Sequence, residues 1–467
     1  MNPENNNSPA RIQLRDNYNY NEDERCDHKL TPEQRIVLRE YSGKTVSELA
    51  KENSNLIVFP LTANGKNDDE VDEHPLFTFT ERDGGKNCYF KTGNLVGFFG
   101  IGDLMFEIGS RFDYDKYTKR TSHHFFFYML QQVFFPTVVD LKTKQGLWED
   151  LIDILPYLFP AYLARAFRQG IFRQYRYFEF NDDRLRGTVN IPEHIRKNIP
   201  FMGKIAYRTR EYTSNNSLMH LIRHTIELIR RKGETSNILC SDPDIRKCVN
   251  QVIEFTPDYS PRNLRKVMSQ NLRPNRHPFY TEYDPLRRLC FRILRREQAD
   301  YNESQDQVYG ILFDAAWLWE EYLATLMPTW IKHPRNKARE GALNIYKSGS
   351  SENRIVYPDF YSAEGKIVLD AKYQHLNDMI GDHYSQLMCY MYVLKSDYGV
   401  LIYPSREENK GTDYHEKGVF NGYGGAVGTI NLKIPQNAES FGKFEKEIQK
   451  SQNVLKRKLE RWNPIPE

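Results

Sequence analysis

The segment from 358 to 373, PDFYSAEGKIVLDAKY, restricts the possible folds of this chain more than any other segment. Its second half alternates as a β-strand does, with apolar residues at every second position from 367 to 373. Asp370 and Lys372 lie on the opposite face, beside each other. The letters EGK at 364–366 predict a turn. We therefore expect a β-hairpin that presents a carboxylate and an ammonium group on one face.

The hairpin is expected to bring a second carboxylate, Asp359 on the first strand, close to Asp370 on the second. Two carboxylates a few ångströms apart repel each other unless a cation lies between them. Oxygen ligands of this kind suit Mg²⁺ or Mn²⁺. The face of Asp370 is therefore expected to point to solvent and metal. Such a metal polarises a phosphoryl oxygen and activates a water, which Lys372 would orient or deprotonate. The alternative interpretation is a surface Asp–Lys pair on an edge strand, worth at most about 1 kcal/mol.

The length of the chain, 467 residues, favours two to three domains. Residues 1–28 are polar and rich in Asn, so we predict a disordered tail. A helix is expected to begin with Thr31 as its N-cap, and short β-rich runs follow it to about residue 112. Residues 29–120 are therefore predicted to form a small β domain with a polar loop near 63–74.

The spacing of apolar residues becomes helical further along, so 121–300 is predicted to form a mostly helical middle domain. Residues 301–467 are predicted to form an α/β domain, with a long helix over 305–327 before the hairpin, a helix after it and a further strand over 398–404. The fold class is then multidomain α+β, with a β-rich start, a helical middle and an α/β end.

Composition excludes some classes of protein. The apolar runs are too short to span a bilayer, and the first residues lack the pattern of a signal peptide, so we expect a cytoplasmic protein without a membrane partner. A net charge of +3 does not by itself indicate nucleic-acid binding. Basic residues do gather between 173 and 297, which indicates either a phosphate-facing surface or an ordinary solvated face.

Two other motifs are weaker. Ser42-Gly43-Lys44-Thr45 ends like a nucleotide-binding loop, but Leu38 stands where the first glycine belongs and a helix precedes the motif. His220 and His224 have a spacing that can bind zinc, yet no third ligand is evident. We expect no nucleotide site at the first motif and a packed histidine pair at the second.

Pro358, Asp359, Asp370 and Lys372 together resemble the PD-(D/E)xK nuclease signature, and the surrounding residues resemble the McrC family. Members of that family are the nuclease subunits of McrBC-type and LlaJI-type restriction systems. The resemblance includes two further motifs, an acid after an aromatic residue in the preceding helix and a Q-x-x-x-Y helix after the hairpin. The residues that match these motifs are Glu320, with Glu321 as its competitor, and Gln386 with Tyr390.

The resemblance implies a restriction-endonuclease-like core and a Mg²⁺-dependent (or Mn²⁺-dependent) endonuclease that cleaves double-stranded DNA. The implied metal ligands are Asp359, Asp370, the backbone carbonyl of Ala371 and Glu320. Lys372, Gln386 and Tyr390 complete the implied catalytic set. The resemblance also implies a McrB-like AAA+ GTPase partner, as a hexameric ring, docked on the N-terminal β domain. Two alternatives remain, a stand-alone repair or recombination nuclease and a non-catalytic activator of an AAA+ motor.

Overall fold

The computed structural model describes most of the chain, and the protein forms two compact units, one of residues 1–136 with 305–467 and the other of residues 137–304. The described residues are 10–20, 31–53, 56–60, 75–82, 87–102, 104–115, 120–134, 155–231, 236–240, 243–273, 277–299, 308–334, 341–346, 355–362, 364–378, 381–406, 411–422 and 424–462. The architecture is mixed α+β and multidomain, as predicted. The predicted division placed residues 29–120 and 301–467 in separate domains. In the structure, both segments belong to one compact unit, and the other unit covers residues 137–304.

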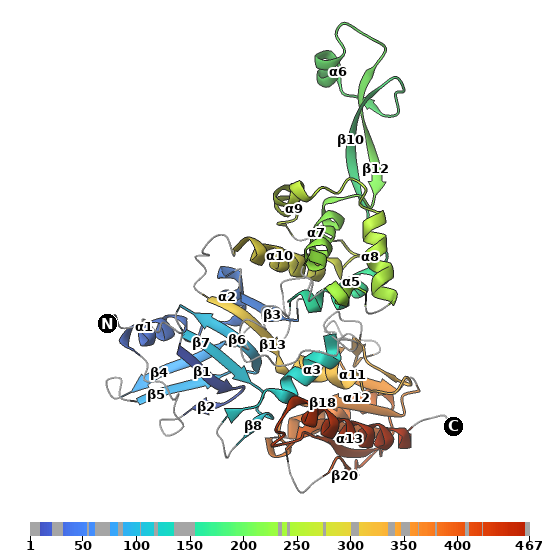
Figure 1. The fold of residues 1–467 in the computed structure, drawn as a ribbon. Coiled ribbons are helices and arrows are strands. Elements are labelled where there is room, and N and C mark those ends of the chain that lie inside the picture. The colour runs from blue at the N-terminus through green and yellow to red at the C-terminus, as the bar shows by residue number, and fades with distance from the viewer. Residues whose placement is uncertain are drawn as a thin grey trace, which may run out of the picture. The chain divides into compact units, whose positions relative to one another are not determined.

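The first unit contains a five-stranded sheet with the order β1-β7-β6-β13-β3, which we call the N-terminal sheet (Figure 1). Its strands are β1 (Ala10–Arg15), β3 (Leu56–Phe59), β6 (Leu95–Ile101), β7 (Leu104–Gly109) and β13 (Val308–Asp314). Beside it lie α1 (Pro32–Tyr41), α2 (Val46–Glu52), β2 (Asn19–Tyr20), β4 (Phe77–Arg82), β5 (Asn87–Thr92), β8 (Tyr114–Asp115), β9 (Arg120–Thr121) and α3 (His124–Phe134). Thr31 caps α1 as predicted, because its side chain accepts a hydrogen bond from the backbone of Gln34. The predicted polar loop at 63–74 lies outside the described residues.

The strand β13 corrects the sequence prediction of one helix over 305–327. It runs antiparallel to β6 and parallel to β3. Gly310 makes this pairing possible, because a Cβ there would lie 2.2 Å from the backbone oxygen of Phe98. The helix α11 (Ala315–Ala324) begins only after Asp314, whose carboxylate accepts from the backbone of Ala316 and Trp317. An apolar run such as VYGILF is compatible with either a strand or a helix. Pairing with β6 and β3 decided that this run forms a strand.

The strand β1 differs from the predicted disordered tail over 1–28. It pairs in parallel with β7, from Ala10 opposite Leu104 to Arg15 opposite Gly109. Its side chains Ile12 and Leu14 are buried in the core of the N-terminal sheet. The alternation of apolar and polar residues in RIQLR is the signal for this strand.

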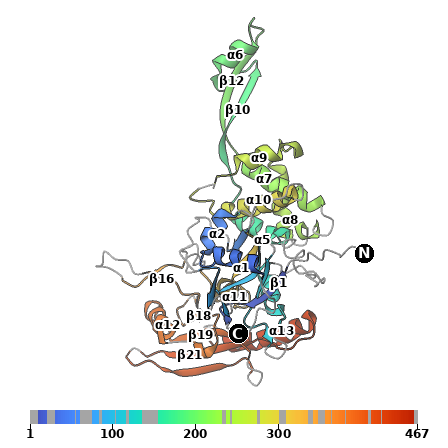
Figure 2. The same cartoon turned by 90° about the vertical axis from the view of Figure 1, so that its left-hand side faces the viewer.

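The same unit contains a six-stranded mixed sheet with the order β14-β17-β18-β19-β21-β20. The helix α12 packs against β18 and β19, and α13 packs against β21 (Figures 1 and 2). The elements of this region are β14 (Ile331–Lys332), β15 (Leu343–Asn344), β16 (Ile355–Val356), β17 (Phe360–Ser362), β18 (Ile367–Ala371), α12 (Gly381–Leu394), β19 (Tyr398–Ser405), β20 (Tyr414–Val419), β21 (Ala426–Lys433) and α13 (Phe441–Leu459).

The second unit contains more helix than strand, and it also contains strands that the prediction for 121–300 did not include. Its basic and aromatic segments form β10 and β12, which pair from Gln174 opposite Thr213 to Asp182 opposite Ile205. These strands, with β11 and α6, form a projecting arm (Figure 1). The elements of this unit are α5 (Leu155–Arg168), β10 (Gln174–Asp182), β11 (Thr188–Val189), α6 (Ile191–Lys197), β12 (Ile205–Thr213), α7 (Ser217–Arg231), α8 (Pro243–Glu254), α9 (Leu264–Gln270) and α10 (Tyr283–Ala299).

The two weaker motifs have structural roles in the fold. Thr45 is the N-cap of α2 and forms a capping box with Glu48. His220 and His224 are both buried on α7, where the ring of His224 lies 4.8 Å from that of Tyr259. Among the described helices, none is both long enough and apolar enough to cross a membrane.

Candidate active site

The predicted hairpin is present and lies inside a sheet. β17 and β18 are antiparallel, with Phe360 opposite Leu369, and β18 also pairs in parallel with β19. All five side chains of β18 are buried, and Asp370 is only 2% exposed. The sequence predicted that the polar face of this strand points to solvent. That expectation is corrected, because α12 covers the face and packs Leu387 and Met391 against Val368.

Asp359 lies just before β17 and reaches across the hairpin to the end of β18. Its Oδ2 atom accepts a hydrogen bond of 2.7 Å from the backbone N–H of Ala371. Burial raises the pKa of Asp359 well above its usual value, and the neighbouring charge of Asp370 raises it further. The two carboxylates are therefore close enough to repel each other, which is the arrangement expected from the hairpin sequence.

Lys372 is the cation of the site. Its Nζ atom lies 2.8 Å from Oδ2 of Asp370 and donates a 3.0 Å hydrogen bond to Oε1 of Gln386. Burial alone would lower the pKa of Lys372, but the charges of Asp370, Asp359 and Glu320 outweigh burial and raise that pKa. The side chain of Lys372 is 16% exposed, so an ammonium group with a fixed position borders the buried carboxylates.

The two residues of the predicted Q-x-x-x-Y motif lie on one face of α12 and continue this chain of contacts. Nε2 of Gln386 donates a 2.7 Å hydrogen bond to the hydroxyl of Tyr390. Burial, followed by the charges of Asp370 and Asp359, raises the pKa of Tyr390. Because both amide atoms of Gln386 are engaged, its orientation is determined and it holds Lys372 in place.

Glu320 enters the site from α11. Its charge is among those that raise the pKa of Lys372, so the two side chains interact electrostatically. The structure thus brings all the predicted side chains into one region, although they come from α11, the β17–β18 hairpin and α12.

The fit of a divalent metal rests on the Asp359–Asp370 pair. No group of three or more His, Cys, Asp or Glu side chains is arranged to hold a metal within the described part of the chain. The pair still offers oxygen donors of the kind that Mg²⁺ prefers. Oδ2 of Asp370 is buried, and the ammonium group of Lys372 lies 2.8 Å from it. The site therefore fits a hard cation held by two carboxylates.

Two histidines that the sequence analysis did not single out border the site. Nδ1 of His333 lies 2.9 Å from the carbonyl oxygen of Asp359, and its ring stacks on Phe360. Nε2 of His383 lies 3.1 Å from Oε1 of Gln374, and burial followed by the charge of Lys372 lowers the pKa of His383. The position of His383, one helical turn before Gln386, was a signal in the sequence. His333 had no local signal.

Comparisons with known proteins agree with the resemblance seen in the sequence. A family model described as McrBC 5-methylcytosine restriction system component matches residues 90–404. No curated protein matches the chain. The chain is similar to a solved half-complex from a tetradecameric assembly of Thermococcus gammatolerans McrB AAA+ hexamers with bound McrC, at 16% identity and a TM-score of 0.43, over 96% of this chain and 100% of that one.

A second solved structure is the McrBC complex of Thermococcus gammatolerans, with 15% identity and a TM-score of 0.31 over 68% of this chain and 87% of that one. The family match extends over more than half of the chain and contains every residue of the candidate site. The chain therefore belongs to the family of McrBC 5-methylcytosine restriction system components, and its predicted membership of the McrC family is confirmed.

Proposed function

We propose that this protein is the cleavage subunit of a McrBC-like restriction system, a Mg²⁺-dependent DNA endonuclease with a PD-(D/E)xK core. The observation that carries the proposal is the contact series from Asp359 and Asp370 through Lys372 to Gln386 and Tyr390. If Asp370 and Lys372 formed only a structural ion pair, a second buried carboxylate, Asp359, would not be needed beside them. Buried like charges beside an oriented cation are typical of catalytic sites.

Asp359 and Asp370 would hold the metal in this mechanism, with the backbone carbonyl of Ala371, and Glu320 would reach it through a water. The bound metal would polarise the scissile phosphate and lower the pKa of the attacking water. The raised pKa of Lys372 keeps it protonated, so it would orient the water and offset negative charge on the phosphate instead of accepting a proton. Gln386, held by Tyr390, would keep that ammonium group in position.

The proposed partner is a McrB-like AAA+ GTPase in a hexameric ring. The related solved complex contains McrC bound to McrB AAA+ hexamers. In the present chain, Thr45, the last residue of the motif that resembled a nucleotide loop, caps α2 instead. Nucleotide hydrolysis is therefore assigned to the partner, and cleavage of double-stranded DNA to this chain.

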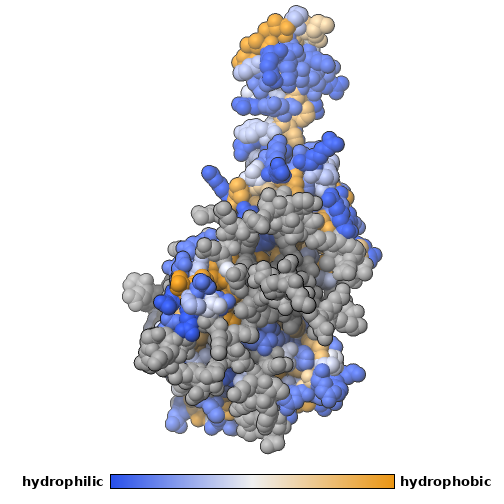
Figure 3. Space-filling model, turned by 60° about the vertical axis from the view of Figure 1, so that its left-hand side comes forward, coloured by the Kyte–Doolittle hydropathy of each residue, from blue (hydrophilic) through white to orange (hydrophobic). Residues whose placement is uncertain are grey.

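The exposed apolar side chains favour the arm as the docking surface over the N-terminal domain. Figure 3 shows apolar residues gathered at the end of the arm. This set, which we call the arm tip, contains Ile191, Ile195, Ile199, Phe201 and Met202, each more than half exposed. Of the residues described in 29–120, Ile36 is the large apolar side chain that is comparably exposed. Exposed apolar groups of this kind mark interaction surfaces.

The proposal is tested by mixing the full-length chain with a McrB-like AAA+ protein from the same genome, GTP, Mg²⁺ and a plasmid carrying 5-methylcytosine. We expect cleavage that needs all components and that stops when the metal is chelated. Cleavage by the chain with Mg²⁺ alone would favour a stand-alone nuclease. Stimulation of GTP hydrolysis without any cleavage would favour the non-catalytic activator.

A further inference from the structure

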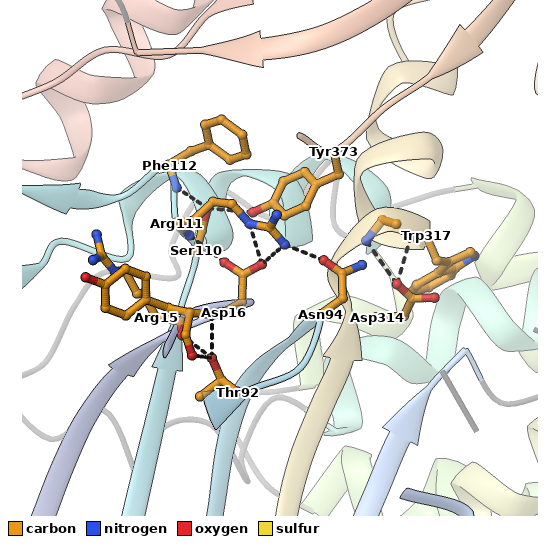
Figure 4. A network of polar contacts seen from close by, with 12 residues as sticks. Arg15, Asp16, Thr92, Asn94, Ser110, Arg111, Phe112, Asp314, Trp317 and Tyr373 are labelled. Atoms are coloured by element: carbon orange, nitrogen blue, oxygen red, sulfur yellow. Dashed lines mark hydrogen bonds and ion pairs between the residues drawn. The ribbon is translucent and has the colours of Figure 1, made fainter. Parts of the chain in front are cut away.

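Residues 110–114, which follow β7, connect the N-terminal sheet to the sheet that carries the candidate site, and we call them the junction loop. Oγ of Ser110 lies 2.6 Å from the hydroxyl of Tyr373, and both residues are buried (Figure 4). The ring of Phe112 lies edge-on to that of Tyr373 with centroids 5.0 Å apart. Tyr373 directly follows Lys372 in the sequence. The junction loop therefore holds the chain at the point where the catalytic strand ends.

Arg111 gives the junction loop a determined position. Its backbone N–H donates to Oδ1 of Asp16, and its guanidinium binds Oδ2 of the same carboxylate through Nε at 2.8 Å and through Nη2. Asp16 follows β1, and its own N–H donates to the carbonyl of Gly109 at 2.9 Å. Both charges are buried, so neither partner can move away without leaving an unpaired charge in the interior.

Arg111 also reaches the start of the helix that carries Glu320. Nη2 of Arg111 donates a hydrogen bond of 2.5 Å to Oδ1 of Asn94. The carbonyl oxygen of Asn94 accepts from the backbone N–H of Ala315, the first residue of α11, at 3.1 Å. Figure 4 shows the guanidinium of Arg111 between Asp16 and Asn94, with the ring of Tyr373 beside it. One cation thus links the strand side and the helix side of the site.

The six-stranded sheet that carries the candidate site is called the catalytic sheet. Residues that follow two of its strands bind the backbone of the junction loop. Nη1 of Arg406, which follows β19, donates to the carbonyl of Arg111 at 3.1 Å. Nε2 of Gln436, which follows β21, donates to the carbonyl of Phe112 at 3.1 Å. Nε of Arg406 also donates to Oε1 of Gln436 at 3.0 Å. The junction loop is therefore attached to three consecutive strands of the catalytic sheet.

We propose that the junction loop positions the two halves of the active site, with Tyr373, Arg111 and Asn94 as positioning residues. Asp370 lies in β18 and Lys372 directly follows that strand, whereas Glu320 comes from α11. The loop and its partners bind the chain beside both elements. A displacement of one half by about 1 Å lowers an enzymatic rate by about a hundredfold. The functional consequence of this proposal rests on the nuclease function proposed above.

The test compares Tyr373→Phe and Asn94→Ala with Tyr414→Phe as the matched control. The hydroxyl of Tyr414 is also buried, but it lacks a hydrogen-bond partner among the described residues. Two measurements are made on the full-length chain. The first is amide hydrogen exchange of residues 367–375 without partner or DNA, and the second is kcat and KM for cleavage of the methylated plasmid with the AAA+ partner and Mg²⁺.

For Tyr373→Phe and Asn94→Ala we expect faster exchange in 367–375, and a kcat about tenfold lower with KM within about twofold of wild type. Tyr414→Phe should match wild type in both measurements. Wild-type exchange in Tyr373→Phe would overturn the proposal, as would faster exchange with an unchanged kcat. If the wild-type complex cleaves no DNA, the proposed nuclease function fails, whereas the exchange measurement still decides whether the loop holds the strand.

Discussion

The carboxylate of Asp359 accepts a hydrogen bond from the backbone N–H of Ala371, 2.7 Å away on the neighbouring strand. This contact places the carboxylate beside the peptide that follows Asp370. The distance between the two acids is therefore determined by the backbone of the hairpin, because a backbone N–H holds the short side chain of Asp359. A rigid pair of like charges is suited to a metal and is unfavourable without one.

Asp370→Asn is expected to separate activity from stability. The substitution keeps the side-chain shape and removes both a charge that repels Asp359 and the partner charge of Lys372, so the two effects oppose each other and the melting temperature should change little. Cleavage should fall by at least about a hundredfold, because the substitution removes one of the two carboxylates that are proposed to hold the metal. Asp370→Ala should additionally lower the melting temperature, because Asp370 is buried and the change leaves a cavity. Plasmid cleavage and thermal unfolding check these outcomes, and a wild-type rate in Asp370→Asn would remove Asp370 from the site.

Lys372→Met should lower the cleavage rate by about a hundredfold while DNA binding persists, because the proposed role of the ammonium group is to act on the water and the phosphate. The control is Lys417→Ala, which removes an exposed lysine of β20. Single-turnover cleavage at saturating DNA measures the rate, and a gel-shift titration measures binding. Equal rates for the two variants would contradict the role of Lys372.

The docking proposal predicts that Phe201→Asp at the arm tip abolishes stimulation of the partner's GTP hydrolysis. A charge at this position opposes burial against an apolar surface. Ile36→Asp on α1 is the matched control, since Ile36 is 59% exposed and Phe201 62% exposed. GTP hydrolysis is measured over a titration of each variant. Loss of stimulation in Ile36→Asp alone would return the docking surface to the N-terminal domain.

Deletion of residues 1–112 is not a clean test of docking. It would remove four strands of the N-terminal sheet, β1, β3, β6 and β7, and would leave β13 without its partners. It would also remove Ser110 and Arg111, which contact Tyr373. Point substitutions therefore test docking better than truncation does.

His224 predicts a pH dependence of stability. Burial, followed by the charge of His220, lowers the pKa of His224 to about 4. As the pH falls from about 6.5 towards about 4, the unfolded chain takes up a proton that the folded chain does not, so stability is lost by at most about 1.4 kcal/mol per pH unit. His224→Phe keeps a ring beside Tyr259 and should flatten this loss in thermal unfolding. The exposed His415→Phe should not, and equal slopes in wild type and His224→Phe would refute the prediction.

The hairpin and α12 were predictable because their signals are local. Alternation over 367–373 and the turn at 364–366 specify which residues share a strand face. The spacing of Gln386 and Tyr390 specifies one helix face. Each feature depends on residues only a few positions apart, so local patterns predicted the proximity of the two carboxylates. Glu320, Gln386 and Tyr390 were implied by the resemblance to the McrC family.

The tertiary structure decided where those elements lie. Ser110 and Tyr373 are 263 residues apart in sequence, and no local pattern joins them. The strand β13 and the buried face of Asp370 depend on which segments pair and which helix covers them. Sequence patterns encode periodicity and capping through neighbouring residues, whereas the pairing of distant strands is selected by the packing of the whole unit. The sequence by itself therefore determined which charged side chains the hairpin presents together, and the tertiary structure alone decided their burial and their attachment to the N-terminal sheet.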